Sequence, residues 1–181
     1  MKLDVLAFGA HPDDIELACS GSLMKLIAEG KSVGIVDLTE GEMGTRGSIF
    51  TRREESANAS KIIGIAVREN LNLGDSSFEL NQETRVKVIE VIRKYRPTIV
   101  LANAVNDRHI DHPKGAQLVK EAFFLSGLSK IVTSSNNEAQ VAFRPKFLFH
   151  YIQHYHTRPD FVIDITGYQS RKIESILAYK T

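Results

Sequence analysis

The sequence predicts an α/β sandwich with a mostly parallel sheet. Apolar runs of strand length alternate with segments of helical period along the chain. The first run, Val5-Leu6-Ala7-Phe8-Gly9-Ala10, is nearly continuous in apolar residues, which is typical of a parallel strand covered on both faces. The strand-helix order then favours parallel pairing through right-handed crossovers.

The individual elements follow from the same periodicity. Strands are expected over residues 3–10, 33–38, 70–73, 98–102, 147–152 and 161–165, and helices over 15–29, 51–63, 84–95, 113–124 and 168–179. Gly30 ends the first helix, and a Ser/Asn-rich loop is expected at 134–137. The arrangement predicts a Rossmann-like three-layer sandwich that forms a single domain over residues 1–181.

Composition excludes several classes of protein. The chain has 181 residues, enough to bury a core without disulfides, and its one cysteine, Cys19, predicts a small buried residue in a reducing compartment. The formal charge of +1, from 23 basic and 22 acidic residues, favours neither nucleic acid nor an anionic membrane surface as a partner. We find neither a signal-peptide pattern nor a membrane-span pattern, and therefore expect a cytoplasmic location.

Two clusters of histidine and aspartate follow apolar runs. His11-Pro12-Asp13-Asp14 comes after the first expected strand, and the segment Asp107–His112 comes after Ile99–Ala102. Imidazole and carboxylate together suit a zinc ion, which in catalytic sites has three protein ligands and an open position. Ligands of parallel sheets bind beyond the carboxyl ends of the strands, so the two clusters predict one shared metal site.

Each cluster also has an alternative interpretation. Asp13 or Asp14 could cap the following helix, with Glu16 completing a capping box. The second cluster could be a solvated loop before a helix that begins near Pro113. Either explanation is acceptable for one cluster, but the repeated arrangement favours the metal site.

The segment Thr39–Gly47 follows the second expected strand and should border the same crevice. Its three glycines match no phosphate-binding motif, which favours a mobile loop that covers substrate. Arg52 and Arg53 open the next helix, where positive charge opposes the helix dipole. They indicate either an anion site or a surface pair.

Three segments carry a resemblance to a known family. Ala10–Glu16, Leu38–Gly44 and His109–His112 resemble the zinc-dependent N-acetylglucosaminyl deacetylases of the PIG-L/LmbE family. The likeness runs from residue 3 to about residue 179, and within the family it is greatest to the branch that acts in bacillithiol biosynthesis. Family members extend beyond the end of this sequence, so the chain is expected to lack the family's C-terminal segment.

The resemblance implies a ligand set and a base. His11, Asp14 and His112 match the metal ligands, for Zn²⁺ or, in the cell, Fe²⁺. Asp13 matches the general base.

Further roles are implied at five positions. His109 matches the histidine that stabilises or protonates the tetrahedral intermediate, and Asp111 would orient His109 or a ligand. Arg52 matches an arginine that faces the carboxylates of the substrate, with Arg53 as its competitor. Glu42 is a further substrate-binding candidate.

The implied reaction is hydrolysis of N-acetylglucosaminyl malate to glucosaminyl malate and acetate by a homo-oligomer. One alternative is deacetylation of another N-acetylglucosaminyl conjugate, of the inositol or chitobiose type. Another is a sugar-binding protein without catalysis. A dinucleotide-binding domain is disfavoured, because the first turn, Gly9–Asp13, lacks a glycine-rich phosphate loop.

Overall fold

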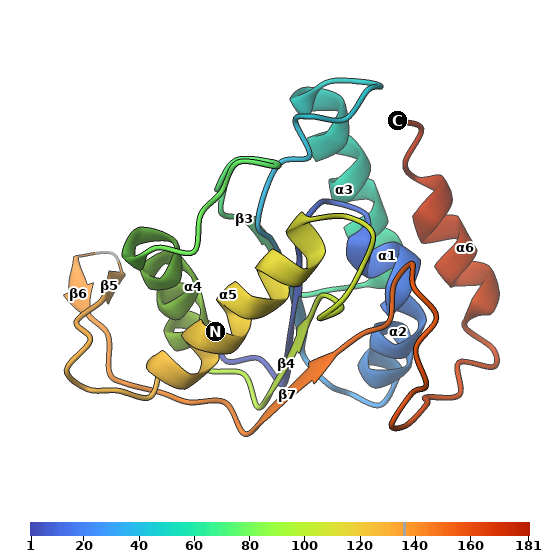
Figure 1. Ribbon diagram of the computed structural model, residues 1–181. Coiled ribbons are helices and arrows are strands. Elements are labelled where there is room, and N and C mark those ends of the chain that lie inside the picture. Colours follow the sequence, from blue (N-terminus) through green and yellow to red (C-terminus); the bar gives the residue numbers. More distant parts are fainter. Residues whose placement is uncertain (136) are drawn as a thin grey trace.

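A five-stranded sheet forms the centre of the protein in the computed structural model, which describes residues 1–135 and 137–181. All its strand pairs are parallel, and the order is β3-β2-β1-β4-β7. This confirms the predicted α/β class and the parallel sheet (Figure 1). The strands are β1 (Val5–Gly9), β2 (Val33–Asp37), β3 (Val67–Asn70), β4 (Ile99–Ala102) and β7 (Phe147–His150).

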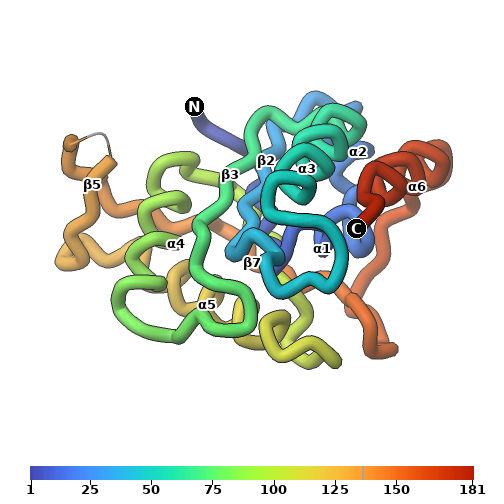
Figure 2. Tube along the Cα trace, turned by 90° about the horizontal axis from the view of Figure 1, so that it is seen from above, coloured from blue at the N-terminus to red at the C-terminus, as the bar shows by residue number. Residues whose placement is uncertain are grey.

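Helices cover both faces of the sheet (Figure 2). One face carries α4 (Gln82–Tyr95) and α5 (Asp111–Leu125), and the other carries α1 (Asp14–Ala18), α2 (Ser20–Ala28) and α3 (Ile49–Ile63). The last helix, α6 (Gln169–Leu177), packs on α1, α2 and α3. Across the two described ranges, no helix is both long enough and apolar enough to cross a membrane.

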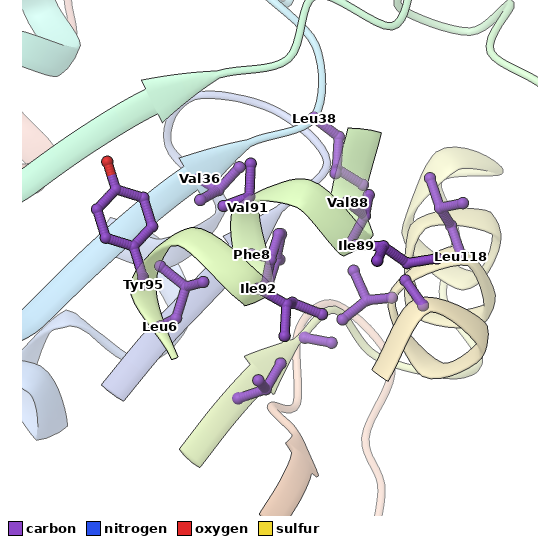
Figure 3. Close-up of a cluster of buried hydrophobic side chains, with 14 of the residues drawn as sticks. Leu6, Phe8, Val36, Leu38, Val88, Ile89, Val91, Ile92, Tyr95 and Leu118 are labelled. Atoms are coloured by element: carbon purple, nitrogen blue, oxygen red, sulfur yellow. The ribbon is translucent and has the colours of Figure 1, made fainter. Parts of the chain in front are cut away.

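Side chains of β1 alternate between two hydrophobic clusters. Leu6 and Phe8 pack toward α4 and α5, as Figure 3 shows, whereas Val5 and Ala7 pack toward α1 and α2. All four are buried. Both faces of the strand are therefore apolar, which explains the unbroken hydrophobic run in the sequence.

Two predicted strands differ from the structure. The predicted strand 70–73 is wrong in position: β3 ends at Asn70, and Asn72 has a left-handed φ of 46° that breaks the extended backbone. Residues 161–165 lie within the described chain and form no strand, although the segment is apolar. It runs over the surface, where Phe161 and Val162 are exposed and Ile165 approaches Gly21 of α2.

The predicted helix 15–29 is divided at Cys19, whose φ of −127° departs from helical geometry. Cys19 is buried as predicted, and burial raises the pKa of its thiol to about 12. The predicted loop 134–137 begins with a short strand, β5 (Ser134–Ser135), which pairs with β6 (Glu138–Ala139) just beyond the loop; residue 136 lies outside the described residues.

A buried ionic cluster connects α1 to the sheet. Arg68 on β3 donates from Nε to Asp37 Oδ2 at 2.7 Å and from Nη1 to Glu16 Oε1 at 2.6 Å. The side chains of Asp37 and Glu16 are 3% and 0% exposed. A single guanidinium therefore pairs with two buried carboxylates from different elements.

Arg68→Met should lower the free energy of unfolding by about 3–5 kcal/mol, because it leaves two buried carboxylates without their cation. Urea denaturation followed by circular dichroism measures the loss. Arg85→Met is the matched control, since Arg85 pairs with the half-exposed Glu121 and should cost at most about 1 kcal/mol. Equal losses in the two variants would contradict the role given to the buried cluster.

Candidate active site

The two predicted His/Asp clusters meet at the carboxyl edge of the sheet. β1 and β4 are parallel neighbours, so the turn after β1 and the loop after β4 lie side by side. The ring centroids of His11 and His109 are 4.5 Å apart, and those of His11 and His112 are 5.6 Å apart. Gly9 permits this turn, because a Cβ there would lie 3.1 Å from the His11 carbonyl oxygen and 3.2 Å from the Asp14 Cβ.

Asp14 lies between the two histidines predicted as ligands. Its Oδ1 is 3.1 Å from His112 Nε2, and its Oδ2 is 3.8 Å from His11 Nδ1. Donor atoms of His11, His109 and His112 also lie within 4.8 Å of one another. The structure thus brings together all three predicted ligands, with His109 beside them.

In His11 and His112, the ring nitrogen that does not face Asp14 faces a different carboxylate. His11 Nε2 lies 3.1 Å from Asp75 Oδ1 and 3.4 Å from Asp111 Oδ2, and His112 Nδ1 lies 2.9 Å from Asp107 Oδ1. Such contacts fix the tautomer and the orientation of an imidazole. The carboxylate of Asp111 therefore contacts His11, one of the two partners suggested by the sequence.

The two ring nitrogens of His109 have different surroundings. Its Nδ1 accepts from the Asp111 backbone N–H at 3.3 Å, which leaves Nε2 to carry the proton. Burial and the neighbouring His11 and His112 lower the pKa of His109. Burial also disfavours a charged His112, but hydrogen bonds and charges from Asp14 and Asp107 outweigh it and raise the His112 pKa.

The Asp13 carboxylate pairs with Arg52. Its Oδ2 accepts from Arg52 Nη1 at 3.1 Å, and the same Nη1 donates to the Pro12 carbonyl at 2.9 Å. The backbone φ of Asp13 is 120°, a strained value for an aspartate. Burial raises its pKa to about 6, with Asp14 acting in the same direction and Arg52 opposing both.

The capping alternative is wrong for this turn. Within the described part of the chain, Asp13 makes no side-chain hydrogen bond to the helix that it precedes. Asp14 Oδ2 instead accepts from the His11 backbone N–H at 3.0 Å, and Glu16 is paired with Arg68. Asp14 therefore binds within the His/Asp cluster and Glu16 within the buried ion pairs, and neither caps the helix.

The substrate-binding candidates point in different directions. The Arg52 side chain is 14% exposed and reaches Asp13, whereas that of Arg53 is 61% exposed and pairs with Glu40. Arg53 and Glu40 line a cavity of about 410 Å³ beside Pro12. Glu42 accepts from the backbone N–H of Glu40 and of Asp75, at 3.1 and 2.7 Å, and so braces the loop.

Three residues of the cluster escaped the sequence analysis. Asp75 lies in the loop after β3, two residues beyond the predicted strand 70–73, but no histidine is next to it, so it did not repeat the His/Asp pattern. Asn103 directly follows β4, and Gln153 lies three residues after β7. Their position at the carboxyl edge was a usable signal, although amides are uncommon metal ligands.

The family model described as PIG-L: GlcNAc-PI de-N-acetylase matches residues 6–123. The chain is 40% identical over 114 residues to the uncharacterized deacetylase YaiS of Escherichia coli K12, covering 60% of this chain and 61% of YaiS. It is 28% identical to diacetylchitobiose deacetylase of Thermococcus kodakarensis, in a match that covers 98% of this chain and 69% of that protein. It is also 26% identical to 4-oxalmesaconate hydratase of Pseudomonas putida, in a match that covers 94% of this chain and 70% of that protein.

Among solved structures, the conserved protein TT1542 of Thermus thermophilus matches with a TM-score of 0.92 and 38% identity, covering 98% of this chain and 79% of that one. The chain thus spans about 61–70% of the length of its curated relatives. The family model covers well over half of the chain, including both His/Asp clusters. The chain therefore belongs to the PIG-L family.

Proposed function

We propose that this chain is a metal-dependent deacetylase that hydrolyses the N-acetyl group of an N-acetylglucosaminyl conjugate. The observation that carries the proposal is the convergence of His11, Asp14 and His112 next to a second aspartate, Asp13, whose carboxylate pairs with Arg52. Membership of the PIG-L family and the diacetylchitobiose deacetylase relative support the same chemistry.

The donor set fits a divalent metal. His11 Nδ1, His112 Nε2 and an oxygen of Asp14 would hold it, and two imidazoles with one carboxylate suit zinc or ferrous ion. Carboxylates behind both imidazoles are the outer contacts that metal-binding histidines usually have. When bound, such an ion lowers the pKa of a coordinated water and polarises the acetyl carbonyl.

The remaining polar groups divide the proton transfers. Asp13 lies outside the ligand set and is held by Arg52, so it would accept the proton of the attacking water. His109 carries its proton on Nε2 and would donate a hydrogen bond to the oxyanion. The leaving amine would then take the proton that Asp13 gained from the water, or a proton from His109 when both of its ring nitrogens are protonated.

Two substrate types have equal support. Arg52, which contacts Asp13, and Arg53, which lines the cavity beside Pro12, favour a conjugate that carries carboxylates, such as N-acetylglucosaminyl malate. The relative that acts on diacetylchitobiose favours a disaccharide. The hydratase relative and a sugar-binding protein without catalysis are the rivals, and neither would release acetate.

Replacing the ligands should remove the metal. We expect His11→Ala and His112→Ala to bind zinc more than about 100-fold more weakly than the unmodified chain, a greater loss than outer contacts cause. Metal analysis after dialysis against a chelator measures it. His156→Ala, in an exposed segment, is the control. Full zinc occupancy in both ligand variants would defeat the assignment.

Asp13→Asn should separate the base from the ligands. The variant should retain zinc but lower turnover by about 10²–10⁴, because the amide cannot accept the proton of the water. Asp14→Asn should instead weaken zinc binding itself. Acetate release and metal content are measured on the same preparations, and near-normal turnover of Asp13→Asn would require a different base.

Acetate release from N-acetylglucosaminyl malate, diacetylchitobiose and N-acetylglucosamine tests the substrate. If the malate conjugate is the substrate, Arg52→Lys should lower its kcat/KM about tenfold or more relative to N-acetylglucosamine, because lysine cannot form the paired hydrogen bonds. Any effect of Arg52 on Asp13 lowers kcat/KM for both substrates alike, so it cancels in the ratio of the two kcat/KM values. Arg53→Lys is the comparison, and an unchanged ratio in Arg52→Lys would favour the disaccharide.

A further inference from the structure

Hydrogen bonds join the side chains of Asp14, Asn103 and Gln153 in a closed ring. Gln153 Nε2 donates to Asp14 Oδ1 at 3.0 Å, and Asn103 Nδ2 donates to Asp14 Oδ2 at 2.9 Å. The two amides are also joined, because Asn103 Nδ2 lies 3.1 Å from Gln153 Oε1. The Ala104 backbone N–H donates to the same Oε1 at 3.0 Å.

We propose that Asn103 and Gln153 form an amide clamp whose task is to position Asp14 for the metal. The inference rests on the proposed metal site and adds two positioning residues to it. Neither residue belongs to the two His/Asp clusters.

The hydrogen-bond partners determine which way each amide group is turned. Asn103 is fully buried, and a rotated amide would turn its oxygen toward the Asp14 carboxylate, where like charges repel. Gln153 is fixed in the same way, because its Oε1 faces the Ala104 N–H and its Nε2 faces the carboxylate. Both side chains therefore present N–H groups to Asp14.

Neutral donors suit a carboxylate that must also bind a cation. Asp14 is 4% exposed, so it needs hydrogen bonds to remain charged in the interior. A lysine or arginine in the clamp would neutralise the carboxylate and repel the metal. Two amides satisfy the oxygens, fix the plane of the carboxylate and leave its negative charge for the ion.

The clamp also connects three neighbouring strands. Asp14 follows β1, Asn103 follows β4 and Gln153 follows β7, and these strands are adjacent in the sheet. Gln153 Nε2 further lies 3.5 Å from His112 Nε2, on the side of the ring that faces Asp14. The segment after β7 should therefore contribute to metal affinity although it carries no predicted ligand.

The test is the zinc affinity of the full chain, measured by competition with a chromophoric chelator. Gln153→Met keeps the length of the side chain and removes the three hydrogen bonds that the amide makes with Asp14, Asn103 and the Ala104 backbone, and we expect zinc binding about 10–100-fold weaker. Gln117→Met is the matched control, since Gln117 is an exposed glutamine of α5 that bonds Glu121. Gln153→Asn, one methylene shorter, is the second variant if the methionine variant does not fold.

Further measurements separate positioning from other roles. Denaturation of the metal-free proteins establishes that each variant folds, and the spectrum of bound Co²⁺ should change in Gln153→Met but not in the control. Saturating zinc should restore most of kcat. The double variant Asn103→Ala/Gln153→Met should lose less zinc affinity than the product of the two single fold-losses, because both amides act on one carboxylate.

The outcomes distinguish this inference from the proposed function. Failure of the unmodified chain to bind zinc would overturn the metal site and the clamp together. Normal zinc affinity in a folded Gln153 variant would overturn the clamp alone. Turnover that stays low at saturating zinc would overturn the positioning role and place Gln153 in contact with substrate.

Discussion

Parallel pairing of β1 with β4 is the constraint on which the candidate site depends. Val5 pairs with Ile99 and Ala7 with Leu101, so both strands end at the same edge of the sheet. The turn after β1 and the loop after β4 must then lie next to each other. Because β1 is buried on both faces, its end is a rigid platform, and short segments suffice to bring imidazole and carboxylate groups together.

The protein handles its buried charges in two ways. Arg68 pairs with both Asp37 and Glu16 in a buried cluster that connects α1 to the sheet, so each of these carboxylates has a cationic partner within the protein. Asp14, by contrast, is held by the neutral amides of Asn103 and Gln153. A permanent cation suits a structural cluster, whereas amide donors add no permanent countercharge to a carboxylate that is to bind a metal.

The sequence predicted the parts of the site that depend on local pattern. His11 and Asp14 lie in a short motif just after β1, His109 and His112 lie in a short motif between β4 and the first turn of α5, and the structure brings the two motifs together. What could not be predicted depends on contacts between distant segments: the partners of Asp75, Asn103 and Gln153 are set by tertiary packing. The fold shows the same division. The strongly periodic elements were predicted within a few residues, whereas the strand at 70–73 was misplaced because a left-handed residue ended it, and an apolar surface segment at 161–165 imitated a strand.

The charge balance of the cluster gives a separate argument for a cation. Four carboxylates, those of Asp14, Asp75, Asp107 and Asp111, face His11 and His112. Among the described residues, Lys114 Nζ approaches Asp111 at 3.6 Å, and Arg52 is engaged with Asp13. Mutual repulsion between buried carboxylates is costly unless positive charge lies among them, and without a metal that charge would have to come from a protonated imidazole such as His112. A divalent ion between the inward nitrogens would supply that charge at the point where the three proposed ligands already converge.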